Sequence, residues 1–259
     1  YADRNAALGD PDFVENPVAA LLDKSYAAKI RAKIAPFRAG KSDAVKPLGM
    51  AESHETTHFS IVDEQGNAVS VTYTLNGSFG AGVVADGTGI LLNNEMDDFT
   101  SKPGVANLYG LVQGEANAIA PGKTPLSSMS PTIVTKDGKL FMVIGSPGGA
   151  RIITITLEAI LNVIDHGMTI SEAVDAPRIH HQWLPDKVVM EPFALSRDTQ
   201  NILAEMGYDV GIDPNWTVWG KAAGILAGGD SLRAVEAGGG ARFYGAMDAR
   251  SLTGRAIGY

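Results

Sequence analysis

Two β-hairpin patterns constrain the fold of this 259-residue chain more than any other feature. Polar and apolar residues alternate over 57–62 and over 68–74, with a turn sequence at 63–67. A second pair of alternating runs, 132–135 and 140–144, leads into a Ser-Pro-Gly-Gly turn at 146–149 and helical spacing over 150–166. Strands followed by helices, with few β-α-β alternations, predict an α+β fold of packed layers rather than an open parallel sheet.

Shorter signals complete the expected fold. Apolar spacing predicts two short helices within 17–34 and a helix over 196–206 that ends at Gly207, and 241–246 has strand character. Thr169 and Glu172 have the spacing of a capping box and predict another helix start. Residues 35–55 are rich in Pro, Gly and polar side chains, which is typical of an exposed linker that a processing event can open.

Composition excludes several function classes. The net charge of −8 and the absence of a Lys/Arg run argue against nucleic acid or an anionic membrane as the main partner. The chain has no cysteine, so disulfides, thiolate metal sites and cysteine nucleophiles are excluded. The longest apolar stretch, 152–164, is too short and too polar to span a bilayer. Because the chain begins with Tyr1 rather than Met, we expect a piece of a longer precursor.

Thr56 opens the first predicted strand and is a candidate nucleophile. A threonine hydroxyl needs a base, and the α-amine freed by breaking the preceding peptide bond has a pKa of about 7.7–8.0, suited to accept its proton. Thr74 ends the partner strand, so we expect it beside Thr56, and Asn76 follows two residues later. Taken alone, a threonine at this position is typical of an ordinary strand.

Two further segments offer groups for binding charge. The turn containing Gly148 and Gly149 precedes a helix, where free backbone N–H groups favour an oxyanion, although glycine also occurs in such turns for steric reasons alone. Residues 95–98 hold three carboxylates, which favour a cation such as the α-ammonium of an amino acid. The alternatives for 95–98 are a solvated loop and a calcium loop, and the spacing of an EF-hand is missing.

Together these segments closely resemble the gamma-glutamyltransferases (gamma-glutamyltranspeptidases) of the N-terminal-nucleophile (Ntn) hydrolase superfamily. The matching motifs are Thr-Thr-His at 56–58, Thr-Leu-Asn at 74–76, Asn-Glu-Met-Asp-Asp-Phe at 94–99, Pro-Leu-Ser-Ser-Met-Ser-Pro at 125–131 and Gly-Ser-Pro-Gly-Gly-Ala-Arg at 145–151. The resemblance implies an αββα four-layer sandwich, of which this chain supplies part. It also implies that 1–55 is the C-terminal end of a large subunit with its linker, and that 56–259 is the small catalytic subunit.

The resemblance assigns a role to each candidate residue. A zymogen cleaves itself between Glu55 and Thr56, after which Thr56 is the nucleophile, Thr74 supports it, and Gly148 and Gly149 form the oxyanion hole. Tyr109 gates the site from a lid loop at 102–110, for which an aromatic residue filling the core is the alternative interpretation. The residues expected to bind the substrate head group are Asn76, Glu95, Asp98, Ser127 and Ser128.

The activity implied is γ-glutamyl transfer or hydrolysis, as in glutathione metabolism, with water, an amino acid or a peptide as acceptor and no cofactor. The resemblance implies a periplasmic or extracellular protein whose missing large-subunit portion supplies the arginine that binds the substrate carboxylate. Residues 215–225 depart from the family pattern, which bears on the acceptor side of the pocket. No metal site is expected, since His180, His181 and Asp186 lack a third ligand with suitable spacing. The alternatives are a cephalosporin-acylase-type amidase on the same scaffold and an inactive fragment that acts only as a structural partner.

Overall fold

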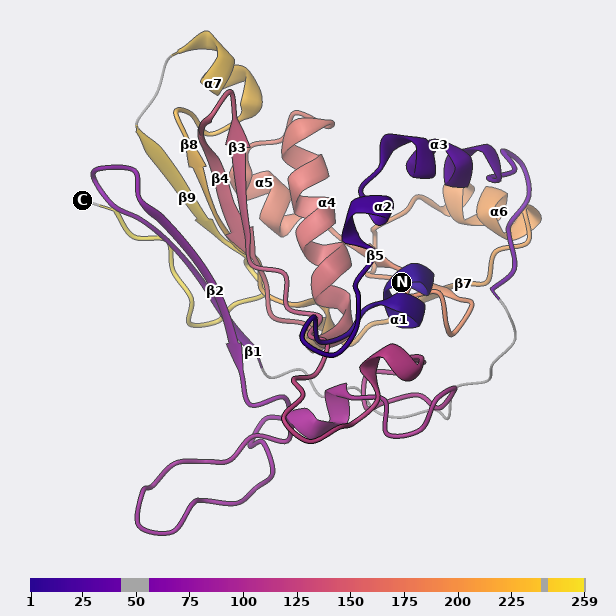
Figure 1. Ribbon diagram of the computed structural model, residues 1–259. Helices are drawn as coiled ribbons and strands as arrows, with labels where there is room; N and C mark the ends of the chain where they lie inside the picture. Colours follow the sequence, from indigo (N-terminus) through magenta and orange to yellow (C-terminus); the bar gives the residue numbers. More distant parts are fainter. Residues whose placement is uncertain (43–55, 239–241, 259) are drawn as a thin grey trace. The chain divides into compact units, whose positions relative to one another are not determined.

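The computed structural model describes residues 1–42, 56–238 and 242–258, which fall into two compact units (Figure 1). The unit that contains both predicted hairpins, called the sheet unit here, is built from residues within 53–94, 128–180 and 213–259. The other, called the loop unit, is built from residues within 1–52, 95–127 and 181–212. Each unit is described by itself. The expected division into residues 1–55 and 56–259 is a division by cleavage, which these units do not test, and it stays a prediction.

Both predicted hairpins are present in the sheet unit. Strands β1 (Thr56–Val62) and β2 (Ala68–Thr74) pair antiparallel in one register from Thr56 opposite Thr74 to Val62 opposite Ala68. Strands β3 (Thr132–Lys136) and β4 (Lys139–Gly145) form the second hairpin. Two further antiparallel strands extend the second hairpin to a sheet of order β3-β4-β8-β9, namely β8 (Ala223–Ala227) and β9 (Phe243–Met247).

Helices cover one face of this four-stranded sheet, and the β1–β2 hairpin covers the other (Figure 1). Helix α4 (Ile152–Ile164) presents Ile155, Ala159 and Val163 at helical spacing to the sheet, and α5 (Ile170–Asp175) starts with the expected capping box. The buried core between helices and sheet is Phe141, Met142, Ile144, Ile155, Ala159, Val163, Ile170, Ala173, Val174, Ala222, Leu226 and Ala246. Three elements complete the sheet unit: β5 (Ile179–His180), the 3₁₀ turn η4 (Trp216–Trp219) and α7 (Leu232–Ala237).

Hydroxyl groups join the hairpin layer to the sheet. The Ser60 hydroxyl donates to the carbonyl of Ala223 at 3.3 Å, and the Ser70 hydroxyl donates to that of Ile144 at 3.2 Å. Ser70 also accepts from the Thr132 amide at 3.1 Å. These bonds replace part of the apolar contact usual between packed sheets, and their directionality fixes the position of β1 and β2 over β4 and β8.

The loop unit contains the predicted N-terminal helices and one arrangement that the sequence analysis missed. Residues 17–34 form two helices as expected, α2 (Val18–Leu21) and α3 (Lys24–Ala32), after α1 (Ala2–Ala7). Strands β6 (Val188–Met190) and β7 (Val210–Ile212) pair in parallel with the expected helix α6 (Arg197–Glu205) between them. These strands are too short to give a period-two signal, so the β-α-β unit was not predicted.

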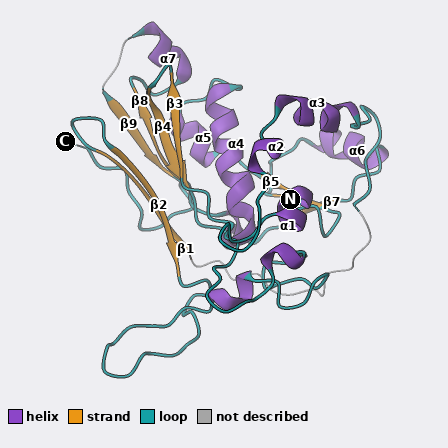
Figure 2. Cartoon of the chain, in the orientation of Figure 1, coloured by secondary structure: helices purple, strands orange, loops and turns teal. Residues whose placement is uncertain are grey.

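The chain between β2 and β3 is almost entirely loop, as Figure 2 shows. Within the loop unit it contains two single-turn 3₁₀ helices, η1 (Glu95–Asp98) and η2 (Glu115–Asn117). Among residues 1–42, 56–238 and 242–258, no helix is long and apolar enough to cross a membrane.

Candidate active site

Thr56 and Thr74 meet at the open end of the β1–β2 hairpin. The register of the two strands places these residues opposite each other, and the Thr56 hydroxyl donates to the Thr74 hydroxyl oxygen at 3.2 Å. The same oxygen accepts from the backbone N–H of Asn76 at 2.9 Å, which fixes the Thr74 side chain. The expected contact between these threonines is therefore present. Glu55, on the other side of the expected scissile bond, lies outside the described residues.

Asn76 turns the chain just beyond Thr74. It is 2% exposed and has a φ of 73°, a left-handed conformation that asparagine tolerates better than most residues. Its amide donates to the carbonyl of Asn94 at 3.1 Å, and the Gly77 N–H donates to the Asn94 side chain at 2.8 Å. The loop after β2 is therefore held closed beside the hydroxyl pair.

His58 connects β1 to the end of β4. Its Nδ1 lies 2.9 Å from the Thr72 hydroxyl, and its Nε2 lies 3.2 Å from the Ser60 hydroxyl. A Cβ added at Gly145 would lie 2.3 Å from the His58 Cε1 atom, so the ring packs flat against a backbone that has no side chain there. Burial lowers the pKa of His58 to about 4, which keeps the imidazole neutral at physiological pH. The sequence analysis took His58 only as part of a motif and missed this contact.

The glycine turn (residues 146–149) follows Gly145 directly and leads into the single 3₁₀ turn η3 (Gly149–Arg151) and then α4. Both glycines expected to form the oxyanion hole have positive φ, 140° at Gly148 and 56° at Gly149. Thr56 is two residues from His58, and Gly148 is three residues from Gly145. Because His58 contacts Gly145, the start of β1 and the glycine turn are neighbours in the sheet unit.

The carboxylates of η1 form the charged part of the loop unit. Desolvation by burial raises the pKa of Asp98 to about 8, and repulsion from Glu95 and Asp97 adds to the shift while Arg4 opposes it. Burial raises the pKa of Glu95 as well, although its hydrogen bond with Asp98 lowers it. At neutral pH the two groups therefore hold a proton between them. A cation bound to the pair can replace that proton, which fits recognition of an ammonium group.

Asn117 fixes Asp98 relative to the segment that contains Ser127. The sequence analysis missed Asn117. Its side chain is fully buried; the amide donates to the Asp98 carbonyl at 2.7 Å, and Oδ1 accepts from the Leu126 N–H at 2.9 Å. Arg4 donates to the neighbouring Ser127 carbonyl at 3.0 Å. The buried Asn117 amide thus joins Asp98 to Leu126, the residue before Ser127.

The remaining expected residues are distributed as follows. Tyr109 is buried in the loop unit, where its carbonyl accepts from the Gln182 side chain at 3.0 Å, and its gating role is not tested by this contact. Ser128 belongs to the sheet unit, and its carbonyl accepts from the Ser130 hydroxyl at 3.1 Å. Across the described part of the chain, no group of three or more His, Cys, Asp or Glu side chains is arranged to hold a metal. His180 instead lies 2.8 Å from the Thr154 hydroxyl.

Comparisons with known proteins agree with these motifs. Residues 1–255 match the family model described as Gamma-glutamyltranspeptidase. A glutathione hydrolase proenzyme of Pseudomonas sp. (strain A14) is 62% identical over 261 residues, which cover all of this chain and 44% of that protein. An acylase ACY 1 proenzyme of Pseudomonas sp. (strain V22) is 41% identical over 210 residues, covering 81% of this chain and 35% of that protein. This chain thus spans less than half the length of the curated relatives it matches.

A solved structure supports the fold independently. The crystal structure of a gamma-glutamyltranspeptidase mutant from Helicobacter pylori superposes with a TM-score of 0.68 at 53% identity, covering 75% of this chain and all of that chain. The expected fold class, α+β with the Ntn-hydrolase architecture, is confirmed by this similarity.

The buried His58 gives a testable pH dependence. The pKa of His58 is about 4 in the folded protein, and the pKa of a histidine in an unfolded chain is about 6.5. Between these values the unfolded chain binds a proton that the folded protein does not, so the free energy of unfolding falls as the pH is lowered through this window. In His58→Gln this part of the pH dependence should disappear. Urea titrations of both full-length proteins at about pH 7 and about pH 4.5 measure it, and equal pH slopes for the two proteins would contradict the burial argument.

Proposed function

Because the chain belongs to the gamma-glutamyltranspeptidase family, we propose that it carries the nucleophile of an enzyme that transfers or hydrolyses γ-glutamyl groups. Thr56 attacks the γ-glutamyl amide of glutathione or a related compound, and the γ-glutamyl group passes from Thr56 to water or to an acceptor amino acid or peptide. The observation that carries the proposal is the hydrogen bond between the Thr56 and Thr74 hydroxyls at the open end of the hairpin.

The proposed mechanism begins with cleavage of the Glu55–Thr56 bond in the precursor. The free α-amine of Thr56 then accepts the proton of its own hydroxyl as the oxygen attacks the amide carbonyl. Thr74 orients the attacking oxygen, and the N–H groups of Gly148 and Gly149 stabilise the tetrahedral oxyanion. The protonated α-amine gives its proton to the leaving amine, and water or an acceptor amine repeats the sequence on the acyl-Thr56 ester.

The substrate class follows from the charged groups of the loop unit. Glu95 and Asp98 are proposed to bind the α-ammonium of the γ-glutamyl group, because burial raises both pKa values, repulsion from Glu95 raises that of Asp98 further, and a cation relieves that repulsion. Ser127 and Ser128 are proposed to bind the α-carboxylate, with Asn76 at the same end of the substrate. Tyr109 is proposed to cover the bound group. No cofactor takes part in this mechanism.

An acylase is the second candidate, because the relatives include acylase ACY 1 proenzymes. Such an enzyme can share the nucleophile and the glycine turn and differ in the acyl group it accepts. The raised pKa values of Glu95 and Asp98 favour a substrate with an ammonium group. Relative rates on γ-glutamyl-p-nitroanilide and on a cephalosporin side-chain amide without an α-ammonium distinguish the two candidates.

The whole protein is proposed to contain a further large-subunit portion that covers apolar faces of this chain. Leu157, Leu161 and Ile164 form an exposed stripe on α4, and alternate apolar side chains of the β1–β2 hairpin are exposed on its outer face. Exposed apolar area of this kind marks an interaction surface. Residues 1–55 would then be the end of the large subunit, and 56–259 the small subunit. By family resemblance we expect the whole protein in the periplasm or outside the cell.

The first prediction concerns processing. The full-length precursor should cleave itself before Thr56, because attack of its hydroxyl on the preceding carbonyl forms an oxyanion of the same kind as turnover does. Mass spectrometry of the purified active protein should find a polypeptide that begins at Thr56, and Thr56→Ala should stay intact. An active protein whose Glu55–Thr56 bond is whole would exclude the mechanism.

The second prediction concerns the head group. Asp98→Asn should weaken binding of γ-glutamyl donors by about 1.5–3 kcal/mol, because an amide cannot balance the substrate ammonium. Self-cleavage should remain, since Asp98 does not activate Thr56. Asp86→Asn, at an exposed loop position, is the matched control and should behave as the unmodified enzyme. An unchanged kcat/KM for Asp98→Asn would remove this residue from the site.

The third prediction concerns the chain by itself. Residues 1–259 expressed alone should show no turnover of γ-glutamyl-p-nitroanilide, because Thr56 lacks a free α-amine until cleavage and the expected carboxylate-binding arginine belongs to the large-subunit portion. The exposed α4 stripe and hairpin face should also promote association. Assays and light scattering beside the full-length precursor measure both effects. Robust turnover by the monomeric chain would overturn this expectation.

A further inference from the structure

The glycine turn contacts a segment that is distant in sequence, residues 219–221. A Cβ added at Gly220 would lie 2.3 Å from the Pro147 carbonyl oxygen and 2.5 Å from the Ser146 hydroxyl oxygen. The backbone of Gly220 therefore touches the turn and leaves no room for a side chain. Gly220 also has a φ of 70°, which favours glycine independently of this contact.

Hydrogen bonds join the two segments. The Lys221 N–H donates to the Ser146 hydroxyl at 3.1 Å, and that hydroxyl donates to the Pro147 carbonyl at 2.7 Å. Ser146 is fully buried, so each of these bonds is expensive to lose. Ile155 of α4 meets both segments, since its Cδ1 lies 2.9 Å from the position of a Cβ at Gly148 and 2.8 Å from that of a Cβ at Gly220. The turn is therefore in contact with both α4 and residues 219–221.

The supporting segment is itself rigidly held. Trp219 is fully buried, and its indole N–H donates to the Asp213 carbonyl at 3.1 Å. The Arg151 guanidinium lies 4.5 Å from the centroid of the Trp219 ring and forms an ion pair with Asp213 at 2.8 Å. These contacts tie residue 219 to Arg151, the last residue of η3.

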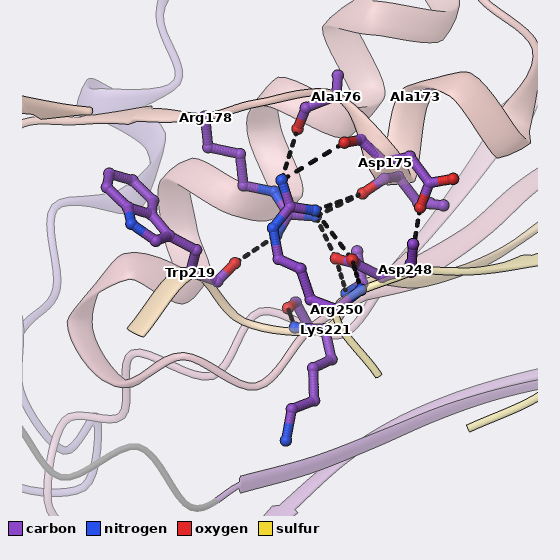
Figure 3. Close-up of polar contacts among 12 residues, drawn as sticks. Ala173, Asp175, Ala176, Arg178, Trp219, Lys221, Asp248 and Arg250 are labelled. Carbon is purple, nitrogen blue, oxygen red and sulfur yellow. Dashed lines mark hydrogen bonds and ion pairs between the residues drawn. The ribbon is translucent and has the colours of Figure 1, made fainter. Parts of the chain in front are cut away.

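A buried ion cluster fixes the segment on both sides of Gly220. Figure 3 shows the guanidinium groups of Arg178 and Arg250 converging on Asp248, with N–O distances of 2.6 and 2.9 Å. Arg178 also donates to the Trp219 carbonyl, and Asp248 accepts from the Ala222 N–H at 3.0 Å. Because both ends of the segment are bound to one cluster, Gly220 cannot move away from the turn without breaking buried charged contacts.

We propose that Ser146 and Gly220 are positioning residues that hold the glycine turn in the geometry needed to stabilise the oxyanion. The inference rests on the proposed function, in which Gly148 and Gly149 supply the donors. Such donors act because they are fixed before the charge develops, so a small displacement weakens them only in the transition state. Disturbing the support should consequently lower kcat and slow self-cleavage while leaving the KM for donor nearly unchanged.

The test compares two glycines of similar positive φ. Gly220 and Gly138 have φ values of 70° and 72°, but a Cβ at Gly138, at the tip of the β3–β4 hairpin, meets nothing within 4 Å. Alanine at either site is strained by the positive φ, but Gly220 also has a ψ of −169°, in a region that essentially only glycine adopts. Only Gly220→Ala also presses on the turn. In the full-length protein, Gly220→Ala should lower kcat and the rate of self-cleavage by about tenfold or more, with donor KM within about twofold. Gly138→Ala should match the unmodified enzyme in all three.

Ser146→Ala keeps the inference testable if Gly220→Ala fails to fold, because it adds no volume and removes the link to Lys221. It should likewise reduce kcat with little change in KM. Full kcat in a folded Gly220→Ala or Ser146→Ala protein, or a loss confined to KM, would overturn the inference. The variant Thr56→Ala separates failure of the positioning role from failure of the proposed function. If Thr56→Ala abolishes turnover while Gly220→Ala and Ser146→Ala retain full turnover, only the positioning role fails.

Discussion

The contact between His58 and Gly145 is the constraint on which the arrangement of the sheet unit depends. A neutral imidazole packs against a backbone with no side chain, and the Ser60 and Ser70 hydroxyls bond to carbonyls of the sheet below. The hairpin that begins at Thr56 is thereby fixed over the strand that ends at the glycine turn. Packing one rigid layer on another sets the distance between Thr56 and the glycine turn more firmly than loops could, because each layer has few alternative positions.

Each compact unit holds its own set of polar groups. The sheet unit holds the hydroxyl pair and the glycine turn, and the loop unit holds Glu95 and Asp98, whose pKa values burial raises. Asn117 carries no charge, yet it joins the Asp98 turn to the serine segment through two hydrogen bonds. A neutral buried amide of this kind fixes main-chain positions without adding to the repulsion among the nearby carboxylates.

Local signals predicted the parts of the structure that local chemistry decides. The hairpins, the capping box at Thr169 and the pairing of Thr56 with Thr74 follow from alternation, turn residues and antiparallel register. Contacts between distant segments were not predictable in the same way. The Arg178 and Asp248 pair joins residues 70 positions apart, and the fit of Gly220 against Pro147 depends on how β8 lies beside β4. No spacing rule encodes such contacts. In the sequence, nothing distinguishes Gly220 from the other glycines of the chain.

The central claim is that Thr56 becomes the acylated nucleophile once its α-amine is free. Rapid mixing of the full-length processed enzyme with γ-glutamyl-p-nitroanilide, acid quenching and peptide mapping test it most directly. The account predicts a γ-glutamyl ester on the peptide that begins at Thr56, formed as fast as p-nitroaniline is released. A γ-glutamyl group on any other residue, or fast release of p-nitroaniline with no label on that peptide, would contradict it.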